Sequence, residues 1–340
     1  MSILSGLYGR AAEWRRAWYG RHPHRRAQLD RPVISVGNLV VGGSGKTPTV
    51  ASLARLLQQR GERPAILSRG YARRESADGV VVVSDGDRVL EPTARSGDEP
   101  QMLARALPGV PVLVARERFL AGRLAERRFD ATVHLLDDGF QHLGLARDID
   151  LLIVSRADLA EQVLPAGRLR EPLVAARYAH ALLVPGSLED VREVAERLGI
   201  GDRGSGIREV FRIAPSYADL RPVRPGNVVP EAWGRVLAVA GIAHPERFFA
   251  ALREQGCDVV REMAFRDHHW FSAADVKAIA RALAESAADL IVTTEKDATR
   301  LFVPDLFYLP MTVAVEPRDG FIAWIAERLR AAREQRGIAA

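Results

Sequence analysis

The sequence predicts an α/β fold in which a mostly parallel sheet is covered by helices on both faces. Between residues 33 and 198, short β-branched runs alternate with helical or loop segments, and a glycine-rich loop joins the first run to the first helix. Such alternation is typical of parallel strands connected by helices. We expect strands at residues 33–36, 65–68, 80–84, 110–115, 132–136, 151–154 and 181–184, and helices at residues 47–60, 99–107, 116–128 and 188–198.

A second, smaller α/β lobe is expected over residues 235–340. Periodicity fades after residue 199, and the cluster Pro215, Pro222, Pro225 and Pro230 predicts a connector at residues 206–234. Beyond it we expect strands at residues 236–240, 259–265, 290–294 and 312–315, and helices at residues 245–255, 273–286 and 320–333. Ser272 is a suitable N-cap for the middle helix. A first lobe at residues 29–205 and this second lobe would leave a cleft between them.

The glycine-rich loop has the features of a phosphate-binding loop. Because it follows an apolar strand and opens a helix, its N–H groups can point at one anion, while Lys46 reaches the outer phosphates and Thr47 can bind magnesium. The usual pattern has glycine where Val40 stands. A glycine-rich turn that carries a solvated lysine is the alternative. The fold is therefore expected to be P-loop NTPase-like, with the nucleotide bound by Val40, Val41, Gly42, Gly43, Ser44, Gly45, Lys46 and Thr47.

Composition and charge restrict the class of protein. The 340 residues suffice for two domains, and the net charge of +5 comes largely from arginines, which suggests an anionic surface or substrate. Nucleic acid is the competing interpretation, but no recognition module accompanies these arginines, so no nucleic-acid partner is expected. The single Cys257 excludes an intramolecular disulfide and a thiolate metal cluster. It favours a reducing compartment and a role in the core.

Residues 1–28 are expected to form an amphipathic, basic segment that associates with a membrane. The apolar run is too short to span a bilayer, and its charges follow it, unlike those of a signal peptide. Such a helix could lie in the membrane interface, with arginines beside anionic lipid. The alternative is a helix that docks on its own protein through the same stripe. That stripe consists of Leu4, Leu7, Tyr8, Ala11, Trp14 and Trp18.

Two acidic pairs are candidates for chemistry. Asp137 and Asp138 end a buried strand, where NTPases place a magnesium ligand, and adjacent residues on a strand face opposite ways, so only one needs to face the nucleotide. A strand-terminal turn would also explain this pair. Asp98 and Glu99 precede Pro100 at an expected helix start, where capping is the simpler explanation.

Polar residues also follow two expected strands of the second lobe. His268 and His269 could orient a carboxylate, bind metal, cap a helix or pack in the core. Lys296 and Asp297 superficially resemble a guanine-reading loop, but their adjacency leaves guanine specificity unsupported. The arginines after other strands, including Arg118 and Arg170, suit phosphate recognition, although each could equally be solvated.

Taken in order, these motifs closely resemble those of the tetraacyldisaccharide 4'-kinase family, which acts in lipid A biosynthesis. The resemblance covers nearly the whole chain. Asp-Asp-Gly-Phe-Gln-His at residues 137–142 and Gly-Asp-Glu-Pro at residues 97–100 make it specific. The other matching segments are residues 37–38, 42–48, 67–71, 164–171, 267–269 and 294–297.

The resemblance implies an activity and a set of roles. A phosphoryl group would pass from ATP to the 4' hydroxyl of a tetraacylated glucosamine disaccharide 1-phosphate, at the cytoplasmic face of the bacterial inner membrane, with peripheral attachment and no obligate protein partner. Asp98 would act as base with His268 paired to it, and Lys46 would stabilise charge. Mg²⁺ would be held by Thr47, Glu99 and Asp138, and the substrate would meet Asp137, Gln141, Arg118 and Arg170.

Two functions of another class remain open. A P-loop NTPase switch or insertion protein would hydrolyse nucleotide without a small-molecule acceptor, and hydrolysis would respond to a protein partner. A peripheral membrane scaffold would have a degenerate nucleotide site. The intact Lys46, Thr47 and acidic pairs argue against the scaffold.

Overall fold

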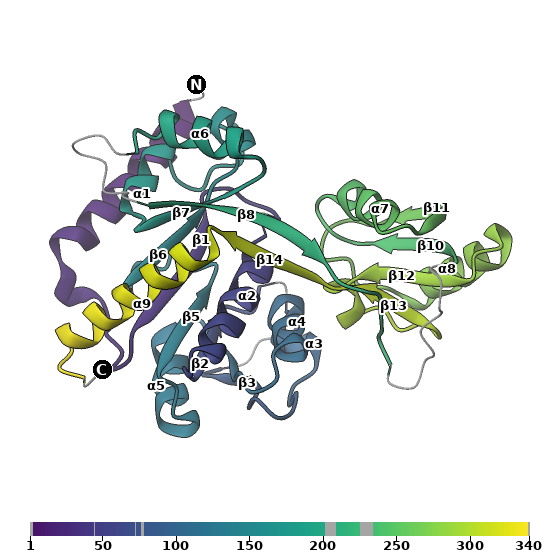
Figure 1. The fold of residues 1–340 in the computed structure, drawn as a ribbon, viewed down its shortest axis with the longest axis horizontal. Coiled ribbons are helices and arrows are strands. Elements are labelled where there is room, and N and C mark those ends of the chain that lie inside the picture. Colours follow the sequence, from purple (N-terminus) through teal and green to yellow (C-terminus); the bar gives the residue numbers. More distant parts are fainter. Residues whose placement is uncertain are drawn as a thin grey trace.

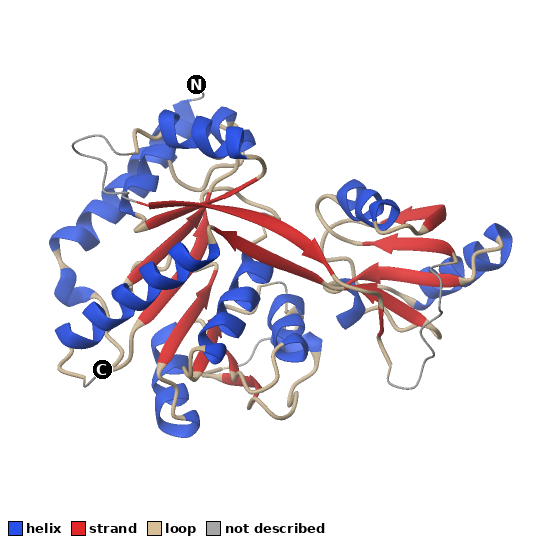
Figure 2. Cartoon of the chain, in the orientation of Figure 1, coloured by secondary structure: helices blue, strands red, loops and turns tan. Residues whose placement is uncertain are grey.

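The protein consists of a large and a small lobe, each built on its own sheet (Figure 1). The computed structural model describes residues 3–338 except 44, 72, 76–77, 201–208 and 225–233. Helices lie on both sides of the strands in each lobe (Figure 2). This arrangement confirms the predicted α/β fold with a second, smaller lobe.

The large sheet contains nine strands within the described residues, in the order β14-β8-β7-β6-β1-β5-β2-β4-β3. Its inner strands are parallel, and only the two edge pairs, β3 with β4 and β14 with β8, are antiparallel. The strand bounds are β1 Val33–Asn38, β2 Pro64–Ser68, β3 Val81–Ser84, β4 Val112–Val114, β5 Val133–Asp137, β6 Ile149–Ile153, β7 Ala181–Pro185, β8 Glu209–Tyr217 and β14 Met311–Glu316.

Alternate residues of β1 explain why both faces of this sheet are covered. Ile34 packs in a cluster that includes Leu53, while its neighbour Val33 packs on the opposite face in a cluster that includes Ala121. Burial on both faces therefore produces continuous β-branched runs. The helices of this lobe are α1 Ile3–Arg21, α2 Lys46–Gln59, α3 Thr93–Ser96, α4 Asp98–Ala106, α5 Arg118–Phe129, α6 Leu188–Arg197 and α9 Arg318–Gln335.

The small lobe has five described strands in the order β11-β10-β12-β13-β9, with α7 Pro245–Glu254 and α8 Ala273–Ser286. Phe248 of α7 and Ile279 of α8 pack in separate clusters against the sheet, and Cys257 lies in the first cluster, as its expected core role requires. Ser272 caps α8 by accepting from Asp275 N. The strands of the small lobe are β9 Arg221–Pro222, β10 Arg235–Ala240, β11 Asp258–Ala264, β12 Leu290–Thr294 and β13 Leu306–Leu309. The short 3-10 helices described in the two lobes are η1 Pro23–Arg25, η2 Arg156–Ala160, η3 Leu173–Tyr178 and η4 Asp297–Thr299.

The last strand and helix belong to the large lobe, so their predicted place in a lobe spanning residues 235–340 is wrong. β14 pairs with β8, and both run from the large sheet toward the small lobe (Figure 1). Phe321 and Trp324 of α9 pack against Phe211 of β8, with ring centroids 5.0 and 5.8 Å from that of Phe211. The sequence shows no boundary at this point, because only Pro310 separates β13 from β14 and the chain changes sheets within one residue. The sheet that β14 joins is decided by its pairing with β8, which lies far away in the sequence.

The connector predicted at residues 206–234 is also wrong for residues 209–217, which form β8. Residues 206–208 and 225–233 lie outside the described residues. Pro215 obscured the strand because proline cannot donate to a ladder. Its position avoids that problem. Pairing with β7 ends at Ile213, so at Pro215 the strand has only β14 beside it among the described strands, and Val313, the residue opposite, donates its N–H to Ser52 Oγ.

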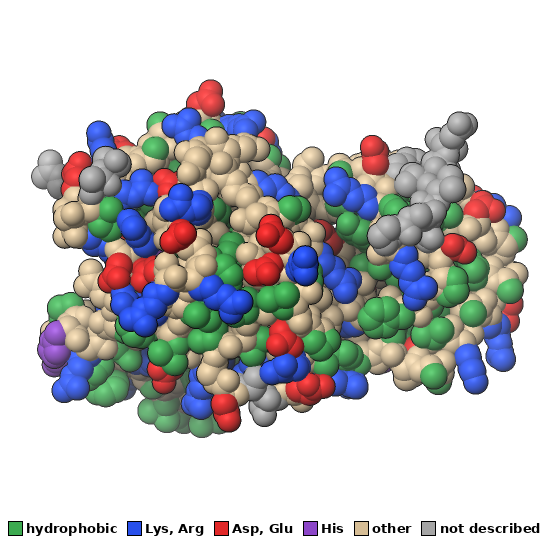
Figure 3. Space-filling model, turned by 90° about the horizontal axis from the view of Figure 1, so that it is seen from below, with side chains coloured by type: hydrophobic (Ala, Val, Ile, Leu, Met, Phe, Trp, Pro, Cys, Tyr) green, Lys and Arg blue, Asp and Glu red, His purple; other side chains and the backbone are tan. Residues whose placement is uncertain are grey.

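Helix α1 lies along the large lobe with its apolar stripe outward. Leu4, Leu7 and Trp14 are 64%, 59% and 66% exposed, whereas Ser5, Gly9 and Arg16 are buried. The alternative in which this stripe docks on the protein is therefore wrong. No helix in the described part of the chain is both long and apolar enough to cross a bilayer. On the face shown in Figure 3, acidic and basic side chains are interspersed rather than gathered in one basic track.

Candidate active site

The glycine-rich loop that is predicted to bind phosphate connects β1 to α2, the position expected for it. Gly42 and Gly45 have φ values of 112° and 79°, which glycine adopts without the penalty that a Cβ imposes. Ser44 lies outside the described residues. Helix α2 then begins at Lys46, and the first N–H groups of a helix favour an anion.

Val40 has a structural role at the position where glycine is usual. It is buried at 4% exposure and forms an isolated antiparallel bridge with Leu169. Val41 N donates to Arg168 O at 2.8 Å, and Arg170 N donates to Leu39 O at 2.6 Å. The start of the loop is therefore held extended against residues 168–170. Only its glycine-rich second half is available to wrap a phosphate.

Lys46 is oriented by the end of β1. Its Nζ donates to Asn38 Oδ1 at 3.2 Å and to Gly42 O at 3.5 Å, and lies 3.7 Å from Asp138. Arg170 also donates to Asn38 Oδ1. The buried Asn38 side chain thus holds both Lys46 and Arg170 beside the loop. The one sequence signal for Asn38 is its position at the carboxyl end of a central strand.

Asp137 ends β5 beside the phosphate loop. Its Oδ2 accepts from Thr47 Oγ1 at 3.2 Å, while its Oδ1 is buried without a hydrogen-bond partner within the described residues. Burial raises the pKa of Asp137 to about 8, and the nearby Glu99 and Asp138 add to the effect. A carboxylate in this setting is stabilised by a cation.

Asp138 lies just beyond the end of β5, in a turn and not on the strand, and it has other partners than Asp137. It has a φ of 54°, and its two oxygens each accept from Arg170 at 2.8 Å. Burial would raise the pKa of Asp138, but the Arg170 hydrogen bonds and the Lys46 charge lower it. Asp138 is therefore a charged, already paired carboxylate, in contrast to Asp137.

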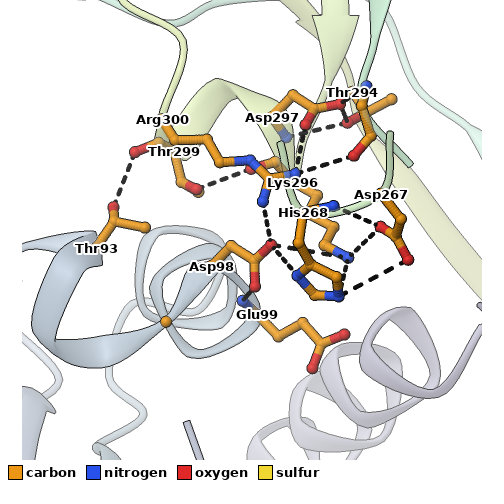
Figure 4. Close-up of polar contacts among 12 residues, drawn as sticks. Thr93, Asp98, Glu99, Asp267, His268, Thr294, Lys296, Asp297, Thr299 and Arg300 are labelled. Atoms are coloured by element: carbon orange, nitrogen blue, oxygen red, sulfur yellow. Dashed lines mark hydrogen bonds and ion pairs between the residues drawn. The ribbon is translucent and has the colours of Figure 1, made fainter. Parts of the chain in front are cut away.

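Asp98 and His268 come from different lobes and contact each other (Figure 4). Asp98 is the first residue of α4, and His268 lies between β11 and α8. His268 Nδ1 is 2.8 Å from Asp98 Oδ2, and Asp98 Oδ1 accepts from Glu99 N at 3.0 Å. His268 has a φ of 56°, a conformation that is uncommon for histidine and occurs where the surroundings fix it.

Two further cations of the small lobe face Asp98, and nothing in their local sequence marks them as part of the site. Arg300 Nη1 donates to Asp98 Oδ2 at 2.6 Å, and Lys296 Nζ lies 3.7 Å from the same oxygen and 3.2 Å from His268 Nε2. Burial would raise the pKa of Asp98, but the His268 hydrogen bond and these charges lower it to about 2. Because Asp98 is ionised, Nδ1 of His268 carries the proton between them.

Arg300 joins the lobes through a buried network. Its Nη2 donates to Asp297 Oδ1 at 2.6 Å and to Gly241 O at 3.1 Å. Asp297 Oδ2 accepts from Gly241 N and from Thr294 Oγ1. Figure 4 shows this network lying over α4, with Asp98 at the centre. The polar stretch after β12 therefore positions Asp98 rather than reading a base.

Arg118 and Gln141 both belong to the surroundings of the segment that follows β5. Burial and the charge of Arg69 lower the pKa of Arg118 to about 10, and Arg118 Nη1 lies 3.3 Å from His142 Nδ1. Gln141 Nε2 donates to Asn38 O at 3.0 Å. In this structure Gln141 supports the end of β1, although the resemblance suggested a contact with substrate.

A basic pocket of about 380 Å³ adjoins the Asp98–His268 pair. Its described lining is Arg69, Gly70, Tyr71, Arg73 and Arg116. The Tyr71 ring packs edge to face on His268, with centroids 5.4 Å apart, which connects this pocket to the dyad. Three guanidinium groups in one concave site suit a phosphate.

His269 packs away from this centre. Its Nε2 lies 3.0 Å from Asp275 Oδ2 and its ring stacks on Phe265, so capping and core packing explain it. Within the described residues no group of three or more histidine, cysteine or acidic side chains is arranged to hold a metal ion.

Comparison with known proteins gives a consistent result. Residues 1–330 match the family model described as tetraacyldisaccharide-1-P 4'-kinase. Curated tetraacyldisaccharide 4'-kinases of Koribacter versatilis and Geobacter metallireducens are 41% and 40% identical over 310 and 315 residues, covering 88% of this chain and 88% of each relative. The crystal structure of LpxK from Aquifex aeolicus, described as an apo form in complex with ATP, superposes with a TM-score of 0.77 at 32% identity, covering 96% of this chain and 97% of that one. The chain belongs to the tetraacyldisaccharide 4'-kinase family of phosphotransferases.

Proposed function

We propose that the chain transfers the γ-phosphoryl group of ATP to the 4' hydroxyl of a tetraacylated glucosamine disaccharide 1-phosphate. The observation that carries the proposal is the Asp98–His268 contact, which assembles across the two lobes. Burial raises the pKa of Glu99 and of Asp137, the Glu99 charge adds to the shift of Asp137, and the Lys46 charge opposes both shifts, so Glu99 lies close to the end of β5 and to the loop. An acceptor held at the dyad would therefore face the phosphate loop.

ATP would lie with its phosphates on Gly42–Lys46, as a nucleotide does on this loop in other P-loop proteins. Lys46 would leave Asn38 and Asp138 for the outer phosphates. The donors beside the loop fit Mg²⁺, because Asp137 Oδ1 is buried and lacks a partner among the described residues, while Thr47 already contacts the other oxygen. Bound there, the metal would neutralise charge on the transferring group.

The structure favours Asp137 over Asp138 as the nearer metal ligand. Both oxygens of Asp138 accept from Arg170, whereas Asp137 has a raised pKa and an unsatisfied oxygen. Glu99 would complete the acidic set. The assignment of Asp138 from the family resemblance thus becomes a supporting role, in which Asp138 and Arg170 hold the end of β5.

Asp98 would accept the proton of the 4' hydroxyl. The pKa of about 2 makes it a weak base. Phosphoryl transfer has a loose transition state in most analyses, so alignment and charge neutralisation count for more than base strength. His268 would hold the carboxylate in position, and Lys296 would neutralise charge as the acceptor oxygen attacks.

The acceptor would be anchored at two further places. The basic pocket lined by Arg69, Arg73 and Arg116 would take its 1-phosphate. The exposed stripe of α1 would lie in the headgroup region of the cytoplasmic face of the inner membrane, where tryptophan is favourable and the acyl chains can remain in lipid. Attachment would then be peripheral, without a spanning helix.

A transfer assay tests the proposal. Purified protein with γ-labelled ATP, Mg²⁺ and the tetraacyl disaccharide 1-phosphate in neutral detergent should yield labelled lipid. The 4'-deoxy acceptor should yield none. Hydrolysis that ignores the disaccharide and rises only with a protein partner would overturn the kinase and support the switch.

A further inference from the structure

Helix α1 carries one buried charge on its protein-facing side. Arg16 is 4% exposed and forms a two-point ion pair with Glu171, which is 5% exposed. The Arg16 Nε–Glu171 Oε2 and Arg16 Nη2–Glu171 Oε1 distances are both 2.7 Å. This pair is inside the protein and so does not serve lipid contact.

Arg16 also holds the segment that follows the two aspartates. Its Nη2 donates to Phe140 O at 3.2 Å, and its guanidinium carbon lies 4.2 Å from the centre of the Phe140 ring. Arg15 adds a bond from Nη1 to Gln141 O at 3.2 Å. Helix α1 is thus attached to residues 140–141 as well as to Glu171.

Both partners of Arg16 adjoin Asp138. Phe140 follows it by two residues, and Glu171 is next to Arg170, whose guanidinium holds both oxygens of Asp138. The position of Phe140 is further restricted by Gly37, because a Cβ built there would lie 2.5 Å from Phe140 Cβ. Arg16 therefore closes a ring of contacts around the end of β5.

Attachment alone does not require this ion pair. Burying two charges costs desolvation energy, and well-packed apolar side chains of similar volume often serve stability as well or better. What a bidentate pair adds is a fixed geometry between three separate segments. Because the Arg16–Glu171 pair lies beside Asp138, the segments that it fixes are those next to the proposed nucleotide site.

We propose that Arg16 is a positioning residue for the phosphate site, which makes α1 a structural part of the catalytic centre as well as the lipid-facing helix. This inference rests on the proposed function, because it assumes that the loop and the residues at the end of β5 bind Mg²⁺–ATP. Displacement of Asp138 and Arg170 would then shift Asn38 and Asp137, which contact Lys46 and Thr47.

The test compares Arg16→Met with the double variant Arg16→Met/Glu171→Met in neutral detergent. The single variant should lose thermal stability, since it leaves Glu171 buried without Arg16, and the double variant should recover much of that loss. Both should bind Mg²⁺–ATP severalfold more weakly by calorimetry and turn over roughly tenfold to a hundredfold more slowly. KM for the lipid should change little.

Arg333→Met is the control, because Arg333 of α9 also pairs with a carboxylate: its Nη2 donates to both oxygens of Glu62, which lies between α2 and β2, away from the site. It should lose stability while keeping nucleotide affinity and turnover. A double variant that recovers stability, nucleotide affinity and turnover together would overturn the inference. So would an Arg333 variant that loses nucleotide affinity as strongly as Arg16→Met. If the wild-type protein binds Mg²⁺–ATP but phosphorylates no lipid, the proposed function fails, while the affinity measurement still decides the role of Arg16.

Discussion

Replacing Arg300 with methionine should impair both stability and turnover. The guanidinium is 1% exposed and lies between Asp98 and Asp297, whose side chains are 3% and 0% exposed. Methionine fills much of the volume but removes the charge. Two buried carboxylates would then lose a partner at 2.6 Å each.

The size of the stability loss in Arg300→Met depends on the hydrogen bonds that Asp98 and Asp297 keep. Breaking a buried pair by removing one partner costs about 3–5 kcal/mol. Asp297 keeps its bonds from Gly241 N and Thr294 Oγ1, and Asp98 keeps His268, so we expect the lower end of that range. Turnover should fall roughly a hundredfold, because Asp98 would no longer be fixed against the small lobe.

Urea unfolding and the lipid phosphorylation assay measure the two effects on the same preparation. Arg300→Lys should recover part of the stability, because it returns one charge. It should recover little turnover, because an ammonium group cannot bridge Asp98 and Asp297 as a planar fork does. Arg105→Met is the control at the same junction, since the one hydrogen bond that Arg105 donates within the described part of the chain goes to Ala298 O at 3.2 Å. It should cost about 1 kcal/mol and leave turnover nearly unchanged.

Wild-type turnover in Arg300→Met would refute the reasoning, even if stability fell. Equal losses of turnover in Arg300→Met and Arg105→Met would also refute it, because the effect would then come from lobe contact in general and not from Asp98.

Three other changes have defined outcomes. Lys46→Ala should lower turnover on the order of a hundredfold or more in a folded protein, because the transferring group loses its cation; normal turnover would exclude this loop as the phosphate site. Replacing Leu7 and Trp14 with serine should weaken co-sedimentation with anionic vesicles at unchanged melting temperature, since both are exposed, and undiminished binding would contradict the interfacial helix. Burial and the Arg118 charge lower the pKa of His142 to about 3, so the unfolded chain binds the proton first and stability falls as pH drops below about 6.5. This dependence of the free energy of unfolding on pH is at most about 1.4 kcal/mol per pH unit, and His142→Gln should lose it. If urea unfolding between pH 7 and 5 gives the same dependence in the variant as in the wild type, the lowered pKa of His142 is contradicted.

The sequence predicted most of the elements because burial leaves a local pattern. Strands of the large sheet are covered on both faces, and this produces the mainly apolar runs at β1, β5 and β6. The chemically important residues stand at the carboxyl ends of these strands or at helix starts, so Asp98, Asp137 and Lys46 could be singled out from their local context.

Partnership between distant segments could not be predicted in the same way. The pattern of β14 is that of any short strand, and nothing within it specifies that its partner is β8 rather than β13. Pro215, which lies within β8, also made this segment look like a connector in the sequence. The choice of sheet is made by long-range packing, here by Phe321 and Trp324 of α9 on the large lobe.

Buried arginines were missed for a related reason. Arg16 lies on the polar side of α1, and Arg300 follows a polar stretch, so both resemble solvated residues in sequence. Their burial depends on carboxylates that lie 155 and 202 positions away in the chain, Glu171 and Asp98. Only the folded structure brings such partners together.

The most direct test of the account is a double-mutant cycle on Asp98 and His268, measured as turnover in lipid phosphorylation. General-base assistance contributes about a hundredfold to ten-thousandfold, so Asp98→Ala and His268→Ala should each lower turnover strongly. The double variant should be much less impaired than the product of the two losses, with ATP affinity nearly unchanged. Fully multiplicative losses would contradict a shared role for the two residues, and a large loss of ATP binding in Asp98→Ala would reassign that carboxylate to the nucleotide.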